Sequence, residues 1–346
     1  MRVLIVRIGA MGDVLHAMPA VAALRAAHPD CFIGWAIEPR WSDLLQIVGD
    51  PEDLSLGIRI GSKALVDRWY SIPTRAWKRS PLSTHTLKDI RALRKVLRDE
   101  RFDLCVDMQG AIKSAAVGLL AEAKVFAGPA QPRERLARRF YDKPVTVTTA
   151  HVVEQGCELL GGAVGETLRP ARVTLPMDEV DEHWADGAVG REKFALISAG
   201  GGWGAKHWPA ERFGQVAAKL GRAGVRTVVN ASLSGSTDVG TVVEASEGFA
   251  RAVPCSVGQL IALVRRAAVV IAGDTGPLHL AAALERPVVA IFGPTDPARN
   301  GPWATRSRVL RDASSLTSHK RSKKVEAGML RIEVDEVAAA AMEMLG

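Results

Sequence analysis

Three short stretches combine glycines with charged side chains at points where a strand gives way to a helix. "GAMGD" (residues 9–13) follows the apolar run "MRVLIV" and carries Asp13. "GGGWGAK" (200–206) carries Lys206, and "GDTGPLH" (273–279) carries Asp274 and His279. A glycine turn that opens a helix can bind an anion through free N–H groups, and a nearby carboxylate can accept a proton. The pattern indicates an anion-binding site with a base close to it.

Asp13 has two interpretations. A carboxylate in the first turn of a helix is favoured by the helix dipole and by unpaired N–H groups. Alternatively, Asp13 is a catalytic base, which must lie near the reacting end of a substrate. A dinucleotide cradle does not fit, because the third glycine of GxGxxG is missing. A carboxylate would also repel a pyrophosphate.

The lysine loop is not a standard phosphate loop. Lys206 does not follow a glycine directly, and no Ser or Thr comes after it. A flexible backbone with one cation still suits a diphosphate. The alternative is a glycine loop with an ordinary surface lysine.

The third stretch ends a buried strand at Gly273. We expect Asp274 and Thr275 to cap the following helix, while Gly276 leaves its first N–H groups open to an anion. His279 lies about one turn into that helix and either reaches the same anion or packs in the core. "FGPTDP" (292–297) is expected to supply a second loop at this sheet edge.

The composition indicates a folded chain of two domains. It has 346 residues, of which 47% are hydrophobic. The four cysteines are scattered without a CxxC pair, so neither disulfides nor a metal site is expected, as in a reducing cytoplasm. We find no apolar run long enough to span a membrane and no signal-peptide pattern. The net charge of +7 fits an ordinary basic enzyme or attraction to polyanions.

Strand and helix patterns alternate along the chain, which predicts an α/β fold with parallel, doubly wound sheets. Strands are expected at 2–8, 31–37, 102–108, 123–128, 193–199, 225–231, 268–273 and 286–293. Helices are expected at 14–28, 87–100, 111–123, 134–141, 209–224, 237–247, 256–267, 277–285 and 333–346. The charged, proline-containing segment 166–190 is interpreted as a connection between domains at 1–165 and 191–346.

Basic side chains cluster in "TRAWKRS" (74–80) and "QPRERLARRF" (131–140). These stretches are either solvated faces or sites for an anionic acceptor or a membrane surface. "HKRSKK" (319–324) is interpreted as a solvated loop, with membrane contact as the alternative.

The motifs together resemble a known family. "MRVLIVRIGAMGDVLHAMPA", "DMQGAIKSA", "AKHWP", "GDTGPLHLAAAL" and "FGPTDP" are similar to the bacterial lipopolysaccharide heptosyltransferases of glycosyltransferase family 9. "RAWKR", "MQGAIKSA" and "PRERLARRFY" are most similar to the heptosyltransferase I branch. The resemblance runs from residue 1 to about residue 300.

The resemblance implies a GT-B fold, in which two Rossmann-like domains face a cleft. The N-terminal domain would bind the acceptor and the C-terminal domain the nucleotide sugar. It further implies inverting, metal-independent transfer of heptose from ADP-L-glycero-β-D-manno-heptose to the Kdo inner core of Kdo–lipid A. No cofactor and no nucleic acid are expected. The enzyme would work in the cytoplasm, with peripheral contact at the cytoplasmic face of the inner membrane.

Site residues follow from the same resemblance. Asp13 matches the general base. The donor-binding positions are Lys206, Asp274, Thr275, Gly276, His279 and Gly202. Gly12, Lys113 and Arg133 match positions on the acceptor side, and no metal ligands are implied.

Two loops depart from the heptosyltransferase I pattern. Glycines replace threonines upstream of Lys206, and "NASLSGST" (230–237) lacks the acid that relatives place near the nucleotide ribose. Another nucleotide sugar or acceptor, or a GT-B-type nucleotide-sugar epimerase, therefore stays an alternative. A non-catalytic anion-binding module also stays open, whereas the missing GxGxxG argues against a nicotinamide oxidoreductase.

Overall fold

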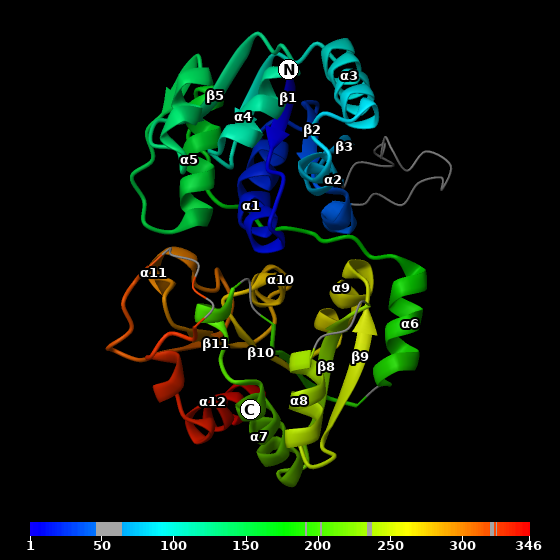
Figure 1. Cartoon of the computed structure of the whole chain (residues 1–346), viewed down its shortest axis with the longest axis vertical. Helices are drawn as coiled ribbons and strands as arrows, with labels where there is room; N and C mark the ends of the chain where they lie inside the picture. The colour runs from blue at the N-terminus through cyan, green and yellow to red at the C-terminus, as the bar shows by residue number, and fades with distance from the viewer. Residues whose placement is uncertain (46–63, 191, 201–202, 234–236, 319–321, 323) are drawn as a thin grey trace. The chain divides into compact units, whose positions relative to one another are not determined.

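The computed structural model describes residues 1–45, 64–190, 192–200, 203–233, 237–318, 322 and 324–346. The chain divides into two compact units, Met1–Pro176 and Met177–Gly346. Each unit is a parallel sheet with helices on its faces (Figure 1). The expected fold class of two Rossmann-like α/β domains is confirmed.

The first unit is built on a parallel sheet with the strand order β3-β2-β1-β4-β5-β6. The central strand β1 is apolar along its length because helices cover both faces of the sheet. The strands are β1 (Arg2–Val6), β2 (Phe32–Ile37), β3 (Arg68–Ser71), β4 (Leu104–Asp107), β5 (Val125–Pro129) and β6 (Lys143–Val145).

Helices cover this first sheet from both sides. One layer pairs α1 with α5, and the other is built from α3, α4 and η3, whose Leu97, Ala115 and Ala137 share one core. The chain leaves β1 toward β2 and leaves β4 toward β5, so right-handed crossovers place α1 and α4 on opposite faces. The helices are α1 (Met11–Ala27), η1 (Pro39–Leu44), α2 (Thr74–Arg79), α3 (Thr84–Asp99), α4 (Ile112–Leu119), η3 (Arg135–Phe140) and α5 (Val152–Val164).

The second unit repeats this winding. Its parallel sheet has the order β12-β11-β10-β7-β8-β9, so the unit's first strand is again central. The strands are β7 (Phe194–Ser198), β8 (Arg226–Ser232), β9 (Ala250–Cys255), β10 (Val269–Gly273), β11 (Val288–Phe292) and β12 (Ser307–Arg311).

The helices of the second unit pack in pairs. α7 packs against α8 and α12, and α6 packs against α9. The helices are α6 (Glu179–Val189), η4 (Gly204–Lys206), α7 (Ala210–Arg222), α8 (Thr237–Ala245), α9 (Val257–Arg266), α10 (Gly276–Ala283), α11 (Pro297–Asn300), η5 (Met329–Arg331) and α12 (Val334–Leu345).

Several local expectations need adjustment. The first helix begins at Met11, and the helix expected at 134–141 is the 3₁₀ helix η3. The segment 166–190, expected as a connection, contains α6, whose start is capped by the Asp178 side chain. The edge strands β3, β6, β9 and β12 and the helix α5 were not expected from the sequence.

All four cysteines are free and buried. Within the described parts of the chain, no helix combines the length and apolar character that crossing a membrane requires.

Candidate functional site

The two sheets have equivalent strand orders. In each sheet, successive strands are first added on one side of the first strand and then on its other side. The reversal points, where the side of addition changes, lie between β1 and β4 and between β7 and β10. In open α/β sheets, ligands bind beyond the carboxyl ends of the strands at such a point. Asp13 follows β1, Lys206 follows β7 and Asp274 follows β10. The fold therefore brings the three charged residues expected from the sequence to the ligand-binding edges of their sheets.

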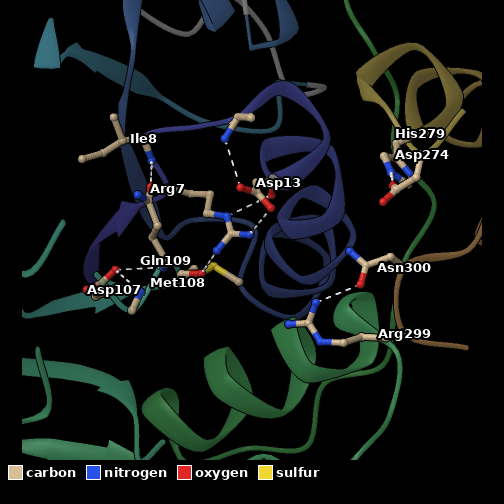
Figure 2. Close-up of polar contacts among 12 residues, drawn as sticks. Arg7, Ile8, Asp13, Asp107, Met108, Gln109, Asp274, His279, Arg299 and Asn300 are labelled. Atoms are coloured by element: carbon tan, nitrogen blue, oxygen red, sulfur yellow. Dashed lines mark hydrogen bonds and ion pairs between the residues drawn. The ribbon is translucent and has the colours of Figure 1, made fainter. Parts of the chain in front are cut away.

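Asp13 occupies the third position of α1, and both of its carboxylate oxygens have partners. Oδ2 accepts the N–H of Ala10 at 3.1 Å, and Oδ1 pairs with Nη2 of Arg7 at 3.0 Å. Arg7 also donates through Nε to the Asp13 carbonyl at 3.0 Å and through Nη1 to the carbonyl of Met108 (Figure 2). Arg7 thus fixes the orientation of Asp13 and ties it to the loop after β4.

The Asp13 carboxylate can still act as a proton acceptor. A carboxylate has about four lone-pair directions, and the contacts with Arg7 and Ala10 use two of them. The Asp13 side chain is 37% exposed. An incoming hydroxyl group can therefore reach a free lone pair. The structure is compatible with both interpretations of Asp13, as a first-turn helix residue and as a base.

The turn before Asp13 requires a glycine. A Cβ atom at Gly9 would lie 2.9 Å from the indole Nε1 of Trp41. The Trp41 ring therefore lies directly against the backbone of this turn. A side chain at position 9 would collide with this ring.

The loop after β4 is organised by a buried carboxylate that the sequence analysis did not single out. Oδ1 of Asp107 accepts the N–H groups of Gln109 at 2.8 Å and Gly110 at 3.1 Å, and Oδ2 accepts the Tyr141 hydroxyl at 2.8 Å. Burial raises the pKa of Asp107, although these hydrogen bonds act in the opposite direction. The signal in the sequence was an acid at the end of the apolar run "LCVD", followed by a glycine.

Gln109 joins this loop to the end of β1 that leads to Asp13. Its Oε1 accepts the N–H of Ile8 at 3.0 Å (Figure 2). The ends of β1 and β4 are thus linked by Gln109 and by Arg7. The position of Asp13 depends on both strands.

The expected acceptor-side residues lie at the same edge of the first sheet. Gly12 precedes Asp13 in α1, and Lys113 is an exposed residue in the first turn of α4. Arg133 is exposed, and its backbone N would lie 3.1 Å from a Cβ at Gly110. Two cationic side chains therefore extend from the segments that follow β4 and β5, beside the strand that leads to Asp13.

In the second unit, Asp274 holds Lys206 and His279 together. One carboxylate oxygen pairs with Nζ of Lys206, and the other lies 3.0 Å from Nε2 of His279. The three side chains are 5–11% exposed. Burial favours the neutral acid, but the hydrogen bond from His279 and the charge of Lys206 outweigh it, so the pKa of Asp274 lies well below its usual value.

Lys206 is positioned from two further sides. Its Nζ lies 4.3 Å from the centre of the Trp203 ring, a distance suited to a cation–π contact. The backbone of η4 approaches the end of β10, because a Cβ at Gly273 would lie 3.5 Å from the Lys206 carbonyl. The end of the lysine loop and the end of β10 therefore form one structural unit.

The N-terminus of α10 is open to an anion, as expected, but its capping differs from the expectation. Thr275 occupies the N-cap position, and its hydroxyl donates to the carbonyl of Gly273 at 3.2 Å. Capping by the Asp274 or Thr275 side chain was therefore a wrong expectation, since Asp274 binds Lys206 and His279 instead. Among the residues that the structure describes, no side chain caps the helix, and its first N–H groups, beginning at Gly276, can meet an anion.

The remaining donor-side predictions have different outcomes. His279 is buried, and its Nε2 faces Asp274 rather than an external ligand. Gly202 lies outside the described residues.

The fold adds two residues that sequence reasoning missed. Asp238, at the start of α8, has its Oδ2 3.7 Å from Nδ1 of His207, the neighbour of Lys206. Thr295 follows β11 and is 4% exposed, and its hydroxyl has no hydrogen-bond partner among the described residues. A buried polar group without a partner is uncommon, and a ligand at this edge would supply one.

Within the described ranges, no group of three or more His, Cys, Asp or Glu side chains is arranged to hold a metal ion.

Two features define the class of protein: the two units have equivalent strand orders, and each carries charged residues in turns at the ends of its strands. They are the features of a GT-B glycosyltransferase, with a carboxylate at a strand end of one Rossmann-like unit and a lysine at a strand end of the other. Residues 90–329 match the family model of glycosyltransferase family 9 (heptosyltransferase). The chain therefore belongs to glycosyltransferase family 9.

Individual relatives agree with this assignment. Lipopolysaccharide heptosyltransferase 1 of Escherichia coli K12 is 28% identical over 318 residues, which cover 90% of this chain and 93% of that protein. The structure of E. coli heptosyltransferase WaaC with ADP has a TM-score of 0.79 and 25% identity, covering 99% of this chain and 100% of that one. E. coli ADP-heptose heptosyltransferase II shares the fold, with a TM-score of 0.77, 18% identity and coverage of 100% and 98%. The expected likeness to heptosyltransferase I is confirmed.

Proposed function

We propose that this glycosyltransferase moves heptose from ADP-L-glycero-β-D-manno-heptose to the Kdo residue of Kdo–lipid A. The transfer is a single displacement that inverts the anomeric centre and uses no metal ion. The enzyme works at the cytoplasmic face of the inner membrane, where its acceptor is anchored by acyl chains. The donor carries over from relatives whose names and bound ligands include ADP and heptose.

One observation carries this proposal. Asp13 stands at the reversal point of one sheet, and Lys206 with the open start of α10 stands at the reversal point of the other. A base and an anion site on separate Rossmann-like units suit a reaction between a hydroxyl group and a nucleotide sugar. A module that only binds anions would not need the base.

Asp13 supplies the proton acceptor. The acceptor hydroxyl oxygen forms a bond to the anomeric carbon, and the bond from that carbon to the ADP oxygen breaks. The hydroxyl proton passes to a free lone pair of Asp13, which Arg7 and Ala10 hold in place. Such base assistance is typically worth about 10²–10⁴-fold in rate.

Lys206 and α10 stabilise the leaving group. ADP gains negative charge as the glycosidic bond breaks, and preorganised donors in a water-poor site stabilise this charge effectively. Asp274 acts as a positioning residue, because it holds the Lys206 ammonium group beside the start of α10. The Lys206 ammonium group and the N-terminus of α10 together stabilise the negative charge that a metal ion stabilises in other transferases.

The acceptor side is cationic. Lys113 and Arg133 are exposed beside the strand that leads to Asp13, and their charges complement the carboxylate of Kdo and the phosphates of lipid A. Asp238, beside His207, is the candidate partner for donor hydroxyl groups, in place of the acid missing from 230–237.

The test is release of ADP from ADP-heptose by the purified protein, with and without deacylated Kdo–lipid A. We expect release that depends on the acceptor, persists with EDTA, and gives a product of inverted anomeric configuration by NMR. Conversion of the donor without any acceptor would indicate an epimerase. Release with another nucleotide sugar only would overturn the donor assignment.

A further inference from the structure

The first unit has an outward-facing surface that the proposed reaction does not use. The exposed side of α4 carries Ile112, Ala116 and Leu119, which are spaced by four and three residues and therefore lie on one side of the helix. The opposite side, with Ala115 and Val117, is buried against the sheet. The helix thus presents an apolar stripe outward as well as inward.

The 3₁₀ helix η3 extends this stripe. It packs against α4, and the Glu134 carboxylate just before it accepts the N–H of Ile112 at 2.9 Å. Ala137 anchors η3 in the core, while Leu136 and Phe140 remain outside. The exposed fractions are 41% for Ile112, 45% for Leu119, 55% for Leu136 and 38% for Phe140.

Cations flank the apolar residues on both sides. On η3, the exposed side chains of Arg135, Arg138 and Arg139 have no ion-pair or hydrogen-bond partner among the described residues. On α3, a row of exposed cations follows the helical repeat; its members are Lys88, Arg91, Lys95 and Arg98. A shallow groove beside this row is lined by Arg91, Arg94, Lys95, Arg98 and Asp99. Glu122, which follows α4, pairs with Arg94 and Arg98 and joins this row to the end of α4.

We propose that this apolar–basic face, made of α3, α4 and η3, docks on an anionic phospholipid bilayer. Exposed leucine, isoleucine and phenylalanine side chains can enter the boundary between headgroups and acyl chains, while the surrounding cations meet lipid phosphates. A folded protein partner would need a surface complementary to this arrangement of apolar and basic side chains. A fluid lipid surface can rearrange to fit the arrangement. The inference rests on the proposed function, in which the acceptor is a membrane lipid.

The test is flotation of the full chain with vesicles of phosphatidylethanolamine and phosphatidylglycerol, and with vesicles of phosphatidylcholine. We expect binding to the anionic vesicles, weaker binding to the neutral ones, and weaker binding at high salt. The charge variant Arg138→Glu/Arg139→Glu should lower partitioning about tenfold or more, because each basic residue near the surface contributes about 1 kcal/mol. The apolar variant Leu136→Ser/Phe140→Ser should lower it comparably.

Matched controls come from the second unit. Lys193→Glu reverses an exposed charge at the start of β7, and Leu316→Ser replaces a leucine that is 78% exposed. Neither control should change vesicle binding. All four variants should keep the wild-type rate with deacylated, water-soluble acceptor, which shows that they fold.

Absence of wild-type binding, equal binding to neutral vesicles, or unchanged binding of both η3 variants would overturn the inference. Displacement of the protein from vesicles by deacylated acceptor would also overturn it, because the face would then be an acceptor site. The vesicle assay needs no donor and no turnover. Failure of the proposed reaction would therefore be seen separately, as missing ADP release with the soluble acceptor.

Discussion

The Asp13 carboxylate has a fixed orientation, because Arg7 and the Ala10 N–H hold its two oxygens. Lys206 is held in a comparable way by Asp274 and the Trp203 ring. Preorganised groups of this kind stabilise a transition state without rearranging during the reaction. Substitutions at these positions should therefore change turnover more than they change folding.

Asp13→Asn should lower kcat by about 10²–10⁴-fold, because the amide has no free carboxylate lone pair for the proton. The amide oxygen can still accept the N–H of Ala10, so the melting temperature should stay close to wild type. ADP release with soluble acceptor measures the first effect and calorimetry the second. Asp30→Asn, at an exposed position of the same unit, is the control. Turnover near wild type would refute the assignment of the base.

Lys206→Met should lower kcat/KM for the donor by about 10²–10³-fold, the usual effect of removing one preorganised transition-state donor. It also removes the ammonium group that pairs with the buried Asp274 carboxylate, so stability should fall. The double variant Lys206→Met/Asp274→Asn removes the buried charge as well. It should regain stability but not activity, as measured by urea unfolding and ADP release. Recovery of activity in the double variant would contradict a role for Lys206 at the leaving group.

At the scale of elements, both sites are junctions between strand ends. Arg7 and Gln109 connect the turn after β1 to the loop after β4, and Asp274 connects the end of β10 to η4 and α10. Neither junction comes from one continuous segment. Both junctions include contacts between residues remote in sequence, such as Arg7 with Met108 and Lys206 with Asp274.

Arg7→Gln should lower kcat by roughly tenfold to a hundredfold, because a misplacement of about 1 Å at the reacting centre can cost that much. The donor KM should change little, because the partners that the described residues give Arg7, namely Asp13, Met108 and Trp35, all belong to the first unit. Arg7→Lys keeps one cation beside Asp13 and should recover part of the rate. Equal kcat values for the two variants would show that Arg7 supports only the fold.

The Asp274 junction should make stability depend on pH in the acid range. Its folded pKa lies well below the ordinary value near 3.9, so the ionised form stabilises the fold above that value. This contribution is lost as pH falls through about 4 and below. Wild type should exceed Asp274→Asn by on the order of 3 kcal/mol at neutral pH, and the difference should shrink below about pH 4. A constant difference in urea titrations from pH 7 to pH 3 would contradict the lowered pKa.

At the scale of the whole molecule, the two units have separate cores and equivalent strand orders, but they carry different functional side chains. The first unit holds the carboxylate of Asp13, and the second holds the anion-binding cation and the open start of α10. We therefore predict that nucleotide binding stabilises the core of the second unit and leaves the stability of the first unit's core unchanged.

ADP at about a hundred times its dissociation constant should stabilise the second unit by about 2.7 kcal/mol. Hydrogen exchange should therefore slow in the core amides of β7 and β10, while those of β1 and β4 stay unchanged. Lys206→Met should weaken this protection, and Asp13→Asn should not. Equal protection of both sheets would contradict the assignment of the donor to the second unit.

The central strands and the three glycine turns were predicted because buried parallel strands are continuous apolar runs bounded by glycine, as in "RVLIV" and "VVIAG". The edge strands were not predicted, because their sequences are not continuous apolar runs. β6 has three residues with a proline among them, and β3 and β12 mix arginine with apolar residues. At the edge of a sheet less of a strand is buried, so its sequence is less constrained.

The sequence by itself determined the residue types, their order and the turns that hold them, since these depend on local periodicity and on glycine. The family likeness followed from the same local motifs. Tertiary structure alone decided the partners, namely Arg7 on Asp13, Gln109 between β1 and β4, and Asp274 on Lys206. It also turned Asp274 away from the capping role expected for it. The last two contacts join residues from different strand ends, and only the pairing of the strands brings such residues together.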